Sequence, residues 1–369
     1  MTGLSARAAR PIHVRIGSLR RALGVPYPWS TAVVWPLRVL FPTPPRRGAF
    51  AALPPESPPA PLAPGGLSIV FLGDVMATTP DLRLAVHDEL KRALSSADLV
   101  FLNCEAPVGE TTRLHGLRFQ LGGDVFARHV AALGIPIERL VVSLANNHVE
   151  DAGERALRET ARRVEALGAR ACGLKETGSD LVAVAGLTPR VGFCAWTHWR
   201  NRPLTVPGTR PWTIEDVDAA DWAAVRRDLA LDVLVGCPHW DMEFRHTPAV
   251  ATRALASRLL GRGFDLLFGH HPHVIQGIER PGEGLVCYSG GNAISTDSYY
   301  WPWAAKLGVA LVVQIDPSRR PIGISYRTIP FVFRASRGRA ELCSLPPADV
   351  APSRERRRFD AVFPPAVPR

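Results

Sequence analysis

The 369-residue chain carries 44 Lys and Arg against 34 Asp and Glu, a formal net charge of +10, and 46% of its residues are apolar. That apolar fraction supplies a sizeable core and excludes a disordered protein. The positive charge does not indicate nucleic-acid binding, because it is concentrated at the ends of the chain and no zinc-finger spacing or aromatic-basic interleaving accompanies it.

Residues 1–66 form a separate segment with thirteen prolines and eight arginines against the single acid Glu56. Because proline caps or breaks helices and strands, this composition predicts an extended arm. The apolar stretch at residues 29–41 is shorter than the roughly twenty residues that span a bilayer. Three interpretations stay open: packing on the folded domain, disorder, and peripheral contact with an anionic membrane. The lack of a clear signal peptide favours a cytoplasmic location.

From residue 67 the hydrophobic pattern alternates between buried strands and amphipathic helices, which is typical of an α/β fold. We predict strands at residues 67–72, 99–102, 140–144, 181–185, 191–196 and 232–236, and helices at 81–95, 124–133, 153–167, 218–229 and 247–261. Four later segments, at 285–289, 307–315, 321–328 and 331–333, predict consecutive strands in a second sheet. The tail from residue 351 is predicted to be solvated.

Six scattered cysteines form no CxxC motif, and several lie within apolar runs such as the one around Cys194. We therefore expect buried free thiols, which favour a reducing compartment.

Polar side chains follow several of the predicted strands. Their residue types are those that bind hard or borderline cations such as manganese, iron or zinc. A single acid after a strand is usually a turn former, but five successive strand ends carry such groups. They are Asp74, Glu105, the Asn146-Asn147-His148 run, His239, and the His270-His271-Pro272-His273 run. In the last run, Pro272 stiffens a turn that could aim His271 and His273 at one point while His270 points elsewhere.

These motifs, in this order, resemble the CapA family, which is named for poly-γ-glutamate capsule biosynthesis and is similar to the calcineurin-like metallophosphoesterases. The resemblance covers about residues 67–335 and rests on Gly73-Asp-Val-Met76, Asn103-Cys-Glu105, Ser143-Leu-Ala-Asn-Asn-His148 with Asp151 behind it, His239-Trp240 with Glu243, Gly269-His-His-Pro-His-Val274 and Tyr288-Ser-Gly-Gly-Asn292. It implies a four-layer α/β/β/α metallophosphoesterase-like sandwich over residues 67–345, followed by a basic tail at 346–369.

The resemblance also implies a centre for one or two divalent cations, Mn, Fe or Zn. Glu105 would take the bridging place. Asn147, His239 and His271 would complete one site, and Asp74 with His273 the other. His148 would act as general acid or base, and Asp151 would orient its ring.

Three positions depart from the family pattern. Met76 stands where ordinary metallophosphoesterases carry a histidine, and a thioether is a poor ligand for a hard cation, so the Asp74 site is expected to be weak or empty. Asp241 stands where a glycine is usual, as either an additional carboxylate or a solvent-exposed residue. Gly290 stands where a leucine is usual.

Three functions remain open. The first is a metal-dependent hydrolase acting on a phosphoester, or on an amide of an anionic polymer such as poly-γ-glutamate. The second is a non-catalytic accessory protein that binds such a polymer for capsule synthesis or export. The third is a peptide epimerase on the same fold. Six basic residues on predicted loops could meet an anionic substrate and are left unassigned: Arg113, His115, Arg118, Arg200, Arg202 and Lys306.

Overall fold

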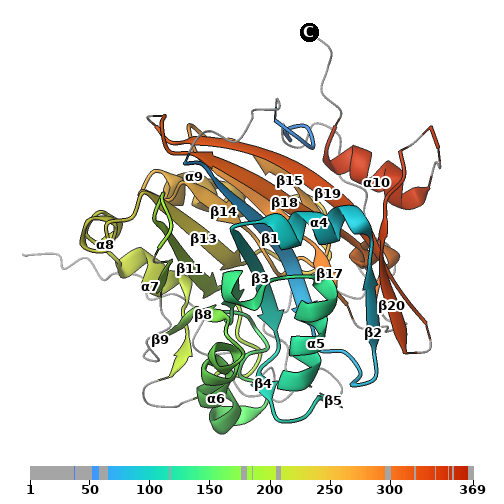
Figure 1. The fold of residues 1–369 in the computed structure, drawn as a ribbon. Helices are drawn as coiled ribbons and strands as arrows, with labels where there is room; N and C mark the ends of the chain where they lie inside the picture. The colour runs from blue at the N-terminus through green and yellow to red at the C-terminus, as the bar shows by residue number, and fades with distance from the viewer. Residues whose placement is uncertain are drawn as a thin grey trace, which may run out of the picture.

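The computed structural model describes residues 37, 52–57, 65–115, 118–175, 181–184, 186–204, 209–295, 301–319, 321–336, 338–347, 349–350 and 353–364. Within them, two large β-sheets lie face to face, and helices cover the outer side of each sheet (Figure 1). No helix among the described residues is long and apolar enough to cross a bilayer.

The first sheet mixes parallel strands from the start of the chain with antiparallel strands from its end. Its order is β2-β20-β19-β18-β1-β3-β7-β8, and β17 pairs with β1. The bounds are β1 (Leu67–Met76), β2 (Arg83–Val86), β3 (Leu99–Glu105), β7 (Leu140–Ser143), β8 (Arg170–Cys172), β17 (Asn292–Ile294), β18 (Leu307–Asp316), β19 (Gly323–Ser336) and β20 (Arg339–Ser344).

The second sheet has the order β10-β11-β13-β14-β16-β15. Its strands are β10 (Leu181–Val184), β11 (Val191–Thr197), β13 (Val233–His239), β14 (Leu266–Phe268), β15 (Ile275–Glu279) and β16 (Leu285–Gly290). Two small sheets lie at the edges, formed by β4 (Val108–Gly109), β5 (Arg113–His115) and β6 (Arg118–Gly122), and by β9 (Leu174–Lys175) with β12 (Arg210–Pro211).

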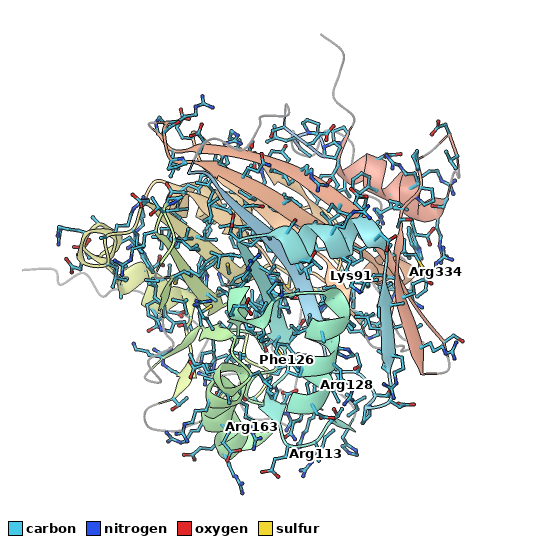
Figure 2. The ribbon with its side chains drawn as sticks, viewed as in Figure 1. Lys91, Arg113, Phe126, Arg128, Arg163 and Arg334 are labelled. Carbon is cyan, nitrogen blue, oxygen red and sulfur yellow. The ribbon has the colours of Figure 1, made fainter. Side chains whose placement is uncertain are left out.

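Three hydrophobic clusters fill the spaces between four layers, so the predicted α/β/β/α sandwich is confirmed. The outer face of the first sheet packs against α4 (Asp88–Ser96), α5 (Gly123–Leu133) and α6 (Gly153–Ala166), and that of the second against α7 (Ile214–Ala219), α8 (Trp222–Asp228) and α9 (Val250–Leu260). The inner faces share the third cluster. On α5, for example, Phe126 is buried while Arg128 is exposed (Figure 2).

Two of the predicted helices are each divided into two elements in the structure. Residues 81–95 contain β2 followed by α4, because the 82–86 segment alternates in period two and pairs in parallel with β20. Residues 218–229 are divided between α7 and α8, because the Asp221 carboxylate accepts a hydrogen bond from the Ala224 amide and starts a new helix.

The late strands do not form a sheet of their own. β18 pairs antiparallel with β1, while β16 joins the second sheet. The two predicted strands at 321–328 and 331–333 are one continuous strand, β19, since Pro330 sits in a strand whose neighbours on both sides still pair along its length.

The prediction of a solvated tail from residue 351 was wrong for the helix α10 (Arg354–Val362). Phe359, Val362 and Phe363 are buried in the inner cluster, and their i, i+3, i+4 spacing makes one apolar face despite the arginines between them. Ser353 caps this helix by accepting a hydrogen bond from the Arg356 amide at 3.0 Å.

Part of the arm packs on the domain. Leu53 packs against the inner cluster, and the Ser57 amide donates to the Tyr326 carbonyl of β19 at 2.9 Å. The alternative of membrane contact concerns residues 29–41, of which all but residue 37 lie outside the described residues. All six cysteines are free thiols, and five are buried, as predicted.

Candidate metal centre

The strands of both sheets deliver polar side chains to one end of the inner layer. Phe71 pairs with Phe101 across β1 and β3, but Asp74 pairs with Asn103, so β1 holds one extra residue between the two pairs. This bulge restores Asp74 to the face that Phe71 occupies. Glu105 reaches the same face of β3 by simple alternation, four residues after Phe101.

Glu105 is the most informative residue of this cluster. It is fully buried, and neither carboxylate oxygen has a hydrogen-bond partner within the described structure. Burial raises the pKa of this carboxyl to about 8. A buried acid without hydrogen bonds is costly unless a cation lies beside it, so this carboxylate fits a metal ligand.

A first group of ligand atoms surrounds the Nε2 atom of His239. It lies 2.8 Å from Asn147 Oδ1, 3.0 Å from His271 Nδ1 and 3.5 Å from Glu105 Oε1. Neighbouring ligands of one cation, each bonded at about 2.1 Å, lie roughly 3.0–3.4 Å apart. Burial lowers the pKa of both His239 and His271 well below the usual value, so the neutral, metal-binding form is favoured. These residues could hold one metal ion.

A second group consists of Asp74, Glu105 and His273. The Asp74 oxygens are already engaged, because Oδ1 accepts hydrogen bonds from the Asn103 amide at 2.8 Å and Oδ2 accepts one from the His271 backbone N–H at 3.2 Å. Burial opposes ionisation of Asp74, but His270 and His273 outweigh it and hold the pKa well below the usual value. The second group therefore offers fewer free lone pairs than the first.

The His-rich turn has the irregular backbone that its sequence suggested. His271 and His273 both have positive φ, 93° and 57°, and their ring centroids lie 6.0 Å apart beside Glu243. His270 does not join His271 and His273 in a potential ligand group of the described residues, and its Nδ1 lies instead 3.0 Å from Asp74 Oδ1. The pairing of β14 and β13 continues into a bridge between His270 and His239, which holds His270 over the first sheet.

His148 lies next to the first group and is held by Asp151. Its Nδ1 is 2.7 Å from Asp151 Oδ2, and the Asp151 side chain is fully buried. Burial alone would lower the pKa of His148, but the hydrogen bond and charge of Asp151 outweigh it and raise the pKa. The imidazole is thus oriented, and its Nε2 is the atom left to exchange protons.

Several contacts of the centre were not identified from the sequence. Glu243, which the resemblance places beside His239-Trp240, is different in that its position near the centre was expected, and it completes a third potential ligand group with His271 and His273. The Asn201 side chain accepts a hydrogen bond from Asn147 at 3.3 Å and also lies 3.4 Å from the His148 ring. Asn201 sits on a loop far along the chain, and nothing in its local sequence indicates this position.

Aromatic rings also enclose the centre. Trp301 meets the His273 ring edge-on at 4.7 Å, Trp199 lies 6.3 Å from His271, and Phe119 lies 4.6 Å from His148, measured between ring centroids. These rings limit access of water, which strengthens electrostatic interactions inside the cluster.

The three departures from the family pattern have local explanations. Met76 is buried and pairs with Glu105 across β1 and β3, so its thioether takes the place that a histidine would have beside the centre. Asp241 has a φ of 61°, the conformation that favours glycine, and its carboxylate is buried and accepts from the Ala249 amide at 2.9 Å, so the solvent-exposed alternative was wrong. At Gly290 a Cβ atom would lie 2.6 Å from the Phe268 ring, which takes the space of a larger residue.

The six unassigned basic residues fall into two sets. Arg200 pairs with Glu150 through two nitrogens, at 2.5 and 2.7 Å, and Lys306 lies at the end of the 3-10 helix Trp303–Lys306. The others, on β5, β6 and the 198–204 loop, line one pocket beside Asp151: Arg113, His115, Arg118 and Arg202. Three of these four were placed on loops by the sequence but lie on strands.

Comparison with known proteins agrees with the resemblance to the CapA family. A family model described as bacterial capsule synthesis protein PGA_cap matches residues 68–297. The capsule biosynthesis protein CapA of Bacillus anthracis is 27% identical over 165 residues, 42% of this chain and 39% of that protein. A probable polyglutamine synthesis accessory protein of Mycobacterium tuberculosis is 27% identical over 236 residues, 55% of this chain and 58% of that protein.

The match therefore spans about two to three fifths of the length of these curated relatives. Among solved structures, a putative 5'-nucleotidase from Staphylococcus aureus is similar with a TM-score of 0.42 and 14% identity, covering 80% of this chain and 58% of that one.

Proposed function

We propose that this chain, which belongs to the PGA_cap family of bacterial capsule synthesis proteins as its motifs predicted, is a metal-dependent hydrolase. The observation that carries the proposal is Glu105, a buried carboxylate with two unpartnered oxygens among imidazoles and an amide. The substrate would be a phosphoester, or an amide within an anionic polymer of the capsule.

The ligand set supports one firmly held cation, Mn, Fe or Zn. Glu105, His239, His271 and Asn147 would hold it, because their ligand atoms are close together and the two histidines favour their neutral form. The group around Asp74 would bind a second ion weakly, since its oxygens already accept hydrogen bonds and Met76 supplies no nitrogen. A cation held here would activate water and neutralise charge that develops on the scissile group.

The protein's own residues would handle the proton. With Nδ1 directed to Asp151, the Nε2 atom of His148 would serve the reacting group, and the raised pKa favours the protonated ring. That state suits a general acid that gives a proton to the leaving group. Asp151 would position the ring without contacting substrate, as its side chain is fully buried.

The test replaces His148 with Asn and uses His87→Asn as the matched control, because His87 precedes α4 and belongs to none of the groups described above. With an aryl phosphate, and with a glutamate oligomer as the amide substrate, turnover by His148→Asn should fall about 10²- to 10⁴-fold while metal content and melting temperature stay unchanged. His87→Asn should keep wild-type turnover. Wild-type protein that binds cation yet cleaves neither substrate would overturn the proposal.

A non-catalytic accessory role is the second candidate, and the name of the mycobacterial relative favours it. In that case His148→Asn would leave the function in capsule synthesis intact, while changes to the basic arm would impair it. Complementation of a capsule-deficient strain with His148→Asn and with a variant whose arm arginines are replaced distinguishes the two candidate functions.

A further inference from the structure

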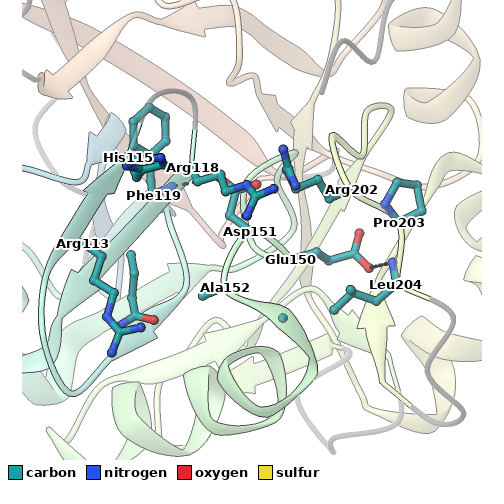
Figure 3. Close-up of a pocket in the computed structure, with 12 residues that line it drawn as sticks. Arg113, His115, Arg118, Phe119, Glu150, Asp151, Ala152, Arg202, Pro203 and Leu204 are labelled. Carbon is teal, nitrogen blue, oxygen red and sulfur yellow. Dashed lines mark hydrogen bonds between the residues drawn. The ribbon is translucent and has the colours of Figure 1, made fainter. Parts of the chain in front are cut away.

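A pocket of about 640 Å³ opens beside the candidate centre. One wall is the β5–β6 hairpin, which contributes Arg113, His115 and Arg118, and the opposite wall is the loop after β11, which contributes Arg202. Two segments that are distant in the sequence thus bring basic side chains to one cavity (Figure 3).

Both acids that line this pocket already have partners. Both Glu150 oxygens accept from Arg200, and Oε1 also accepts from the Leu204 amide at 2.9 Å. The Asp151 carboxylate is buried and turned to His148 and to the Phe119 amide. Within the described part of the chain, no acid pairs with the arginines of the pocket, so its potential is positive.

Arg118 and Arg202 point toward one another across the pocket, and Arg113 stands apart from them (Figure 3). Two guanidinium groups that face each other without an acid repel one another. An oxyanion placed between them would offset this repulsion and could accept charge-assisted hydrogen bonds from the N–H groups of both guanidinium groups.

The pocket is connected to the centre by single residues. Phe119 lines the pocket while its ring lies 4.6 Å from the His148 ring. Arg202 follows Asn201, whose backbone amide donates to the Asn147 carbonyl at 3.1 Å. The residues next to Arg118 and Arg202 in the sequence, Phe119 and Asn201, therefore contact His148 and Asn147.

We infer that Arg118 and Arg202 form an oxyanion subsite that holds a carboxylate or phosphate of the same molecule whose scissile group reaches His148. The inference rests on the proposed function for the identity of that molecule as a substrate. It selects substrates that carry an anionic group beside the bond to be cleaved, and it makes these two arginines determinants of specificity.

The test measures binding to metal-free protein by calorimetry, so that the result does not depend on an active centre. The probes are triglutamate, which offers carboxylates, and tripolyphosphate, which offers phosphates. The double variant Arg118→Gln/Arg202→Gln is compared with Arg227→Gln, which removes one exposed arginine of α8 far from the pocket.

Wild-type protein should bind at least one probe with a stoichiometry of one, and the preferred probe identifies the oxyanion. The double variant should bind it about 10- to 100-fold more weakly, and Arg227→Gln should bind it as wild type does. Equal weakening in both variants, no change in the double variant, or no binding of either probe to wild type would overturn the inference.

The outcome for the proposed function is read separately. If the double variant loses binding but wild type hydrolyses nothing, the hydrolase proposal fails while the subsite stands as a binding site. If His148→Asn abolishes turnover but the double variant binds normally, only the subsite is wrong.

Discussion

Two parts of the inner layer are built from the same strands and have opposite chemistry. At one end four phenylalanines pack between the sheets, Phe71, Phe101, Phe193 and Phe268, with ring centroids 5.2 to 6.4 Å apart. At the other end Asp74, Glu105 and His271 occupy positions three or four residues further along β1, β3 and the segment after β14. We call the first part the aromatic floor and the second the ligand cluster.

The aromatic floor stabilises the fold by itself, whereas the ligand cluster does not. Burial of the rings removes apolar surface from water, and their tilted and stacked contacts add to this gain. In the cluster, burial opposes ionisation of Glu105 and no hydrogen bond compensates it. The floor therefore supplies rigidity, and the cluster holds its ligand atoms in place at a cost in stability.

The largest effect is expected in the floor. Phe101→Ala should lower the free energy of unfolding by about 3–5 kcal/mol, because Phe101 is fully buried against the rings of Phe71, Phe193 and His270 and the cavity cannot close between two sheets. Val250→Ala, at a residue that is 82% exposed, should change it by less than about 0.5 kcal/mol. Urea unfolding of both variants provides the measurement. A floor variant no less stable than the control would show that the floor does not carry the fold.

The local parts of the fold could be predicted because they are encoded locally. The helices α5, α6 and α9 follow from an apolar period that ends at clear breakers such as Gly134 and Gly261. Residues 81–95 were predicted as one helix, although the start of this segment alternates in period two as a strand does. The strand was missed because α4 begins directly after His87, so the helical pattern dominates the segment. The antiparallel pairing of β18 with β1 joins residues about 240 apart in sequence, and no local pattern specifies it.

The ligand cluster was foreseeable and the pocket was not, for a related reason. Each cluster residue stands at a strand end, and parallel strands bring such ends to one edge. The roles given to these residues stay predictions. Arg118 and Arg202 belong to short segments without a strong period, and they meet only because the β5–β6 hairpin and the 198–204 loop fold toward α6.

The second-largest expected effect is the gain in the free energy of unfolding on cation binding, which depends on the ligand cluster and not on the aromatic floor. A ligand that binds only the folded state at 100 times its dissociation constant raises the free energy of unfolding by about 2.7 kcal/mol. Added manganese should give wild type this gain, and Glu105→Gln should lose it, because the amide keeps the shape but not the charge of the ligand.

Phe101→Ala serves as the control for this experiment, since it replaces none of the ligand side chains and should keep the same increment on a lower baseline. Denaturant titrations with and without manganese measure all three proteins. An equal gain for wild type and Glu105→Gln would contradict the assignment of this carboxylate.

The smallest effect contrasts two buried histidines. Burial lowers the pKa of His273, but Glu105 and Asp74 outweigh it and raise the pKa to about 10, so His273 stays protonated between pH 5 and 7.5 in metal-free protein. Burial lowers the pKa of His129 on α5 to about 4, and its ring nitrogen lies 2.7 Å from Thr78 Oγ1. The unfolded chain, with a histidine pKa near 6.5, then binds this proton more tightly than the folded one.

The sign of the pH dependence follows from that difference. The contribution of a neutral His129 is fully present above about pH 6.5 and is lost as the pH falls toward 4, which amounts to about 1–2 kcal/mol at pH 5. His129→Gln cannot take up a proton, so its free energy of unfolding should fall less than that of wild type between pH 7.5 and 5, by that amount. Urea unfolding at the two pH values measures it, and parallel losses in both proteins would show that His129 does not titrate on unfolding.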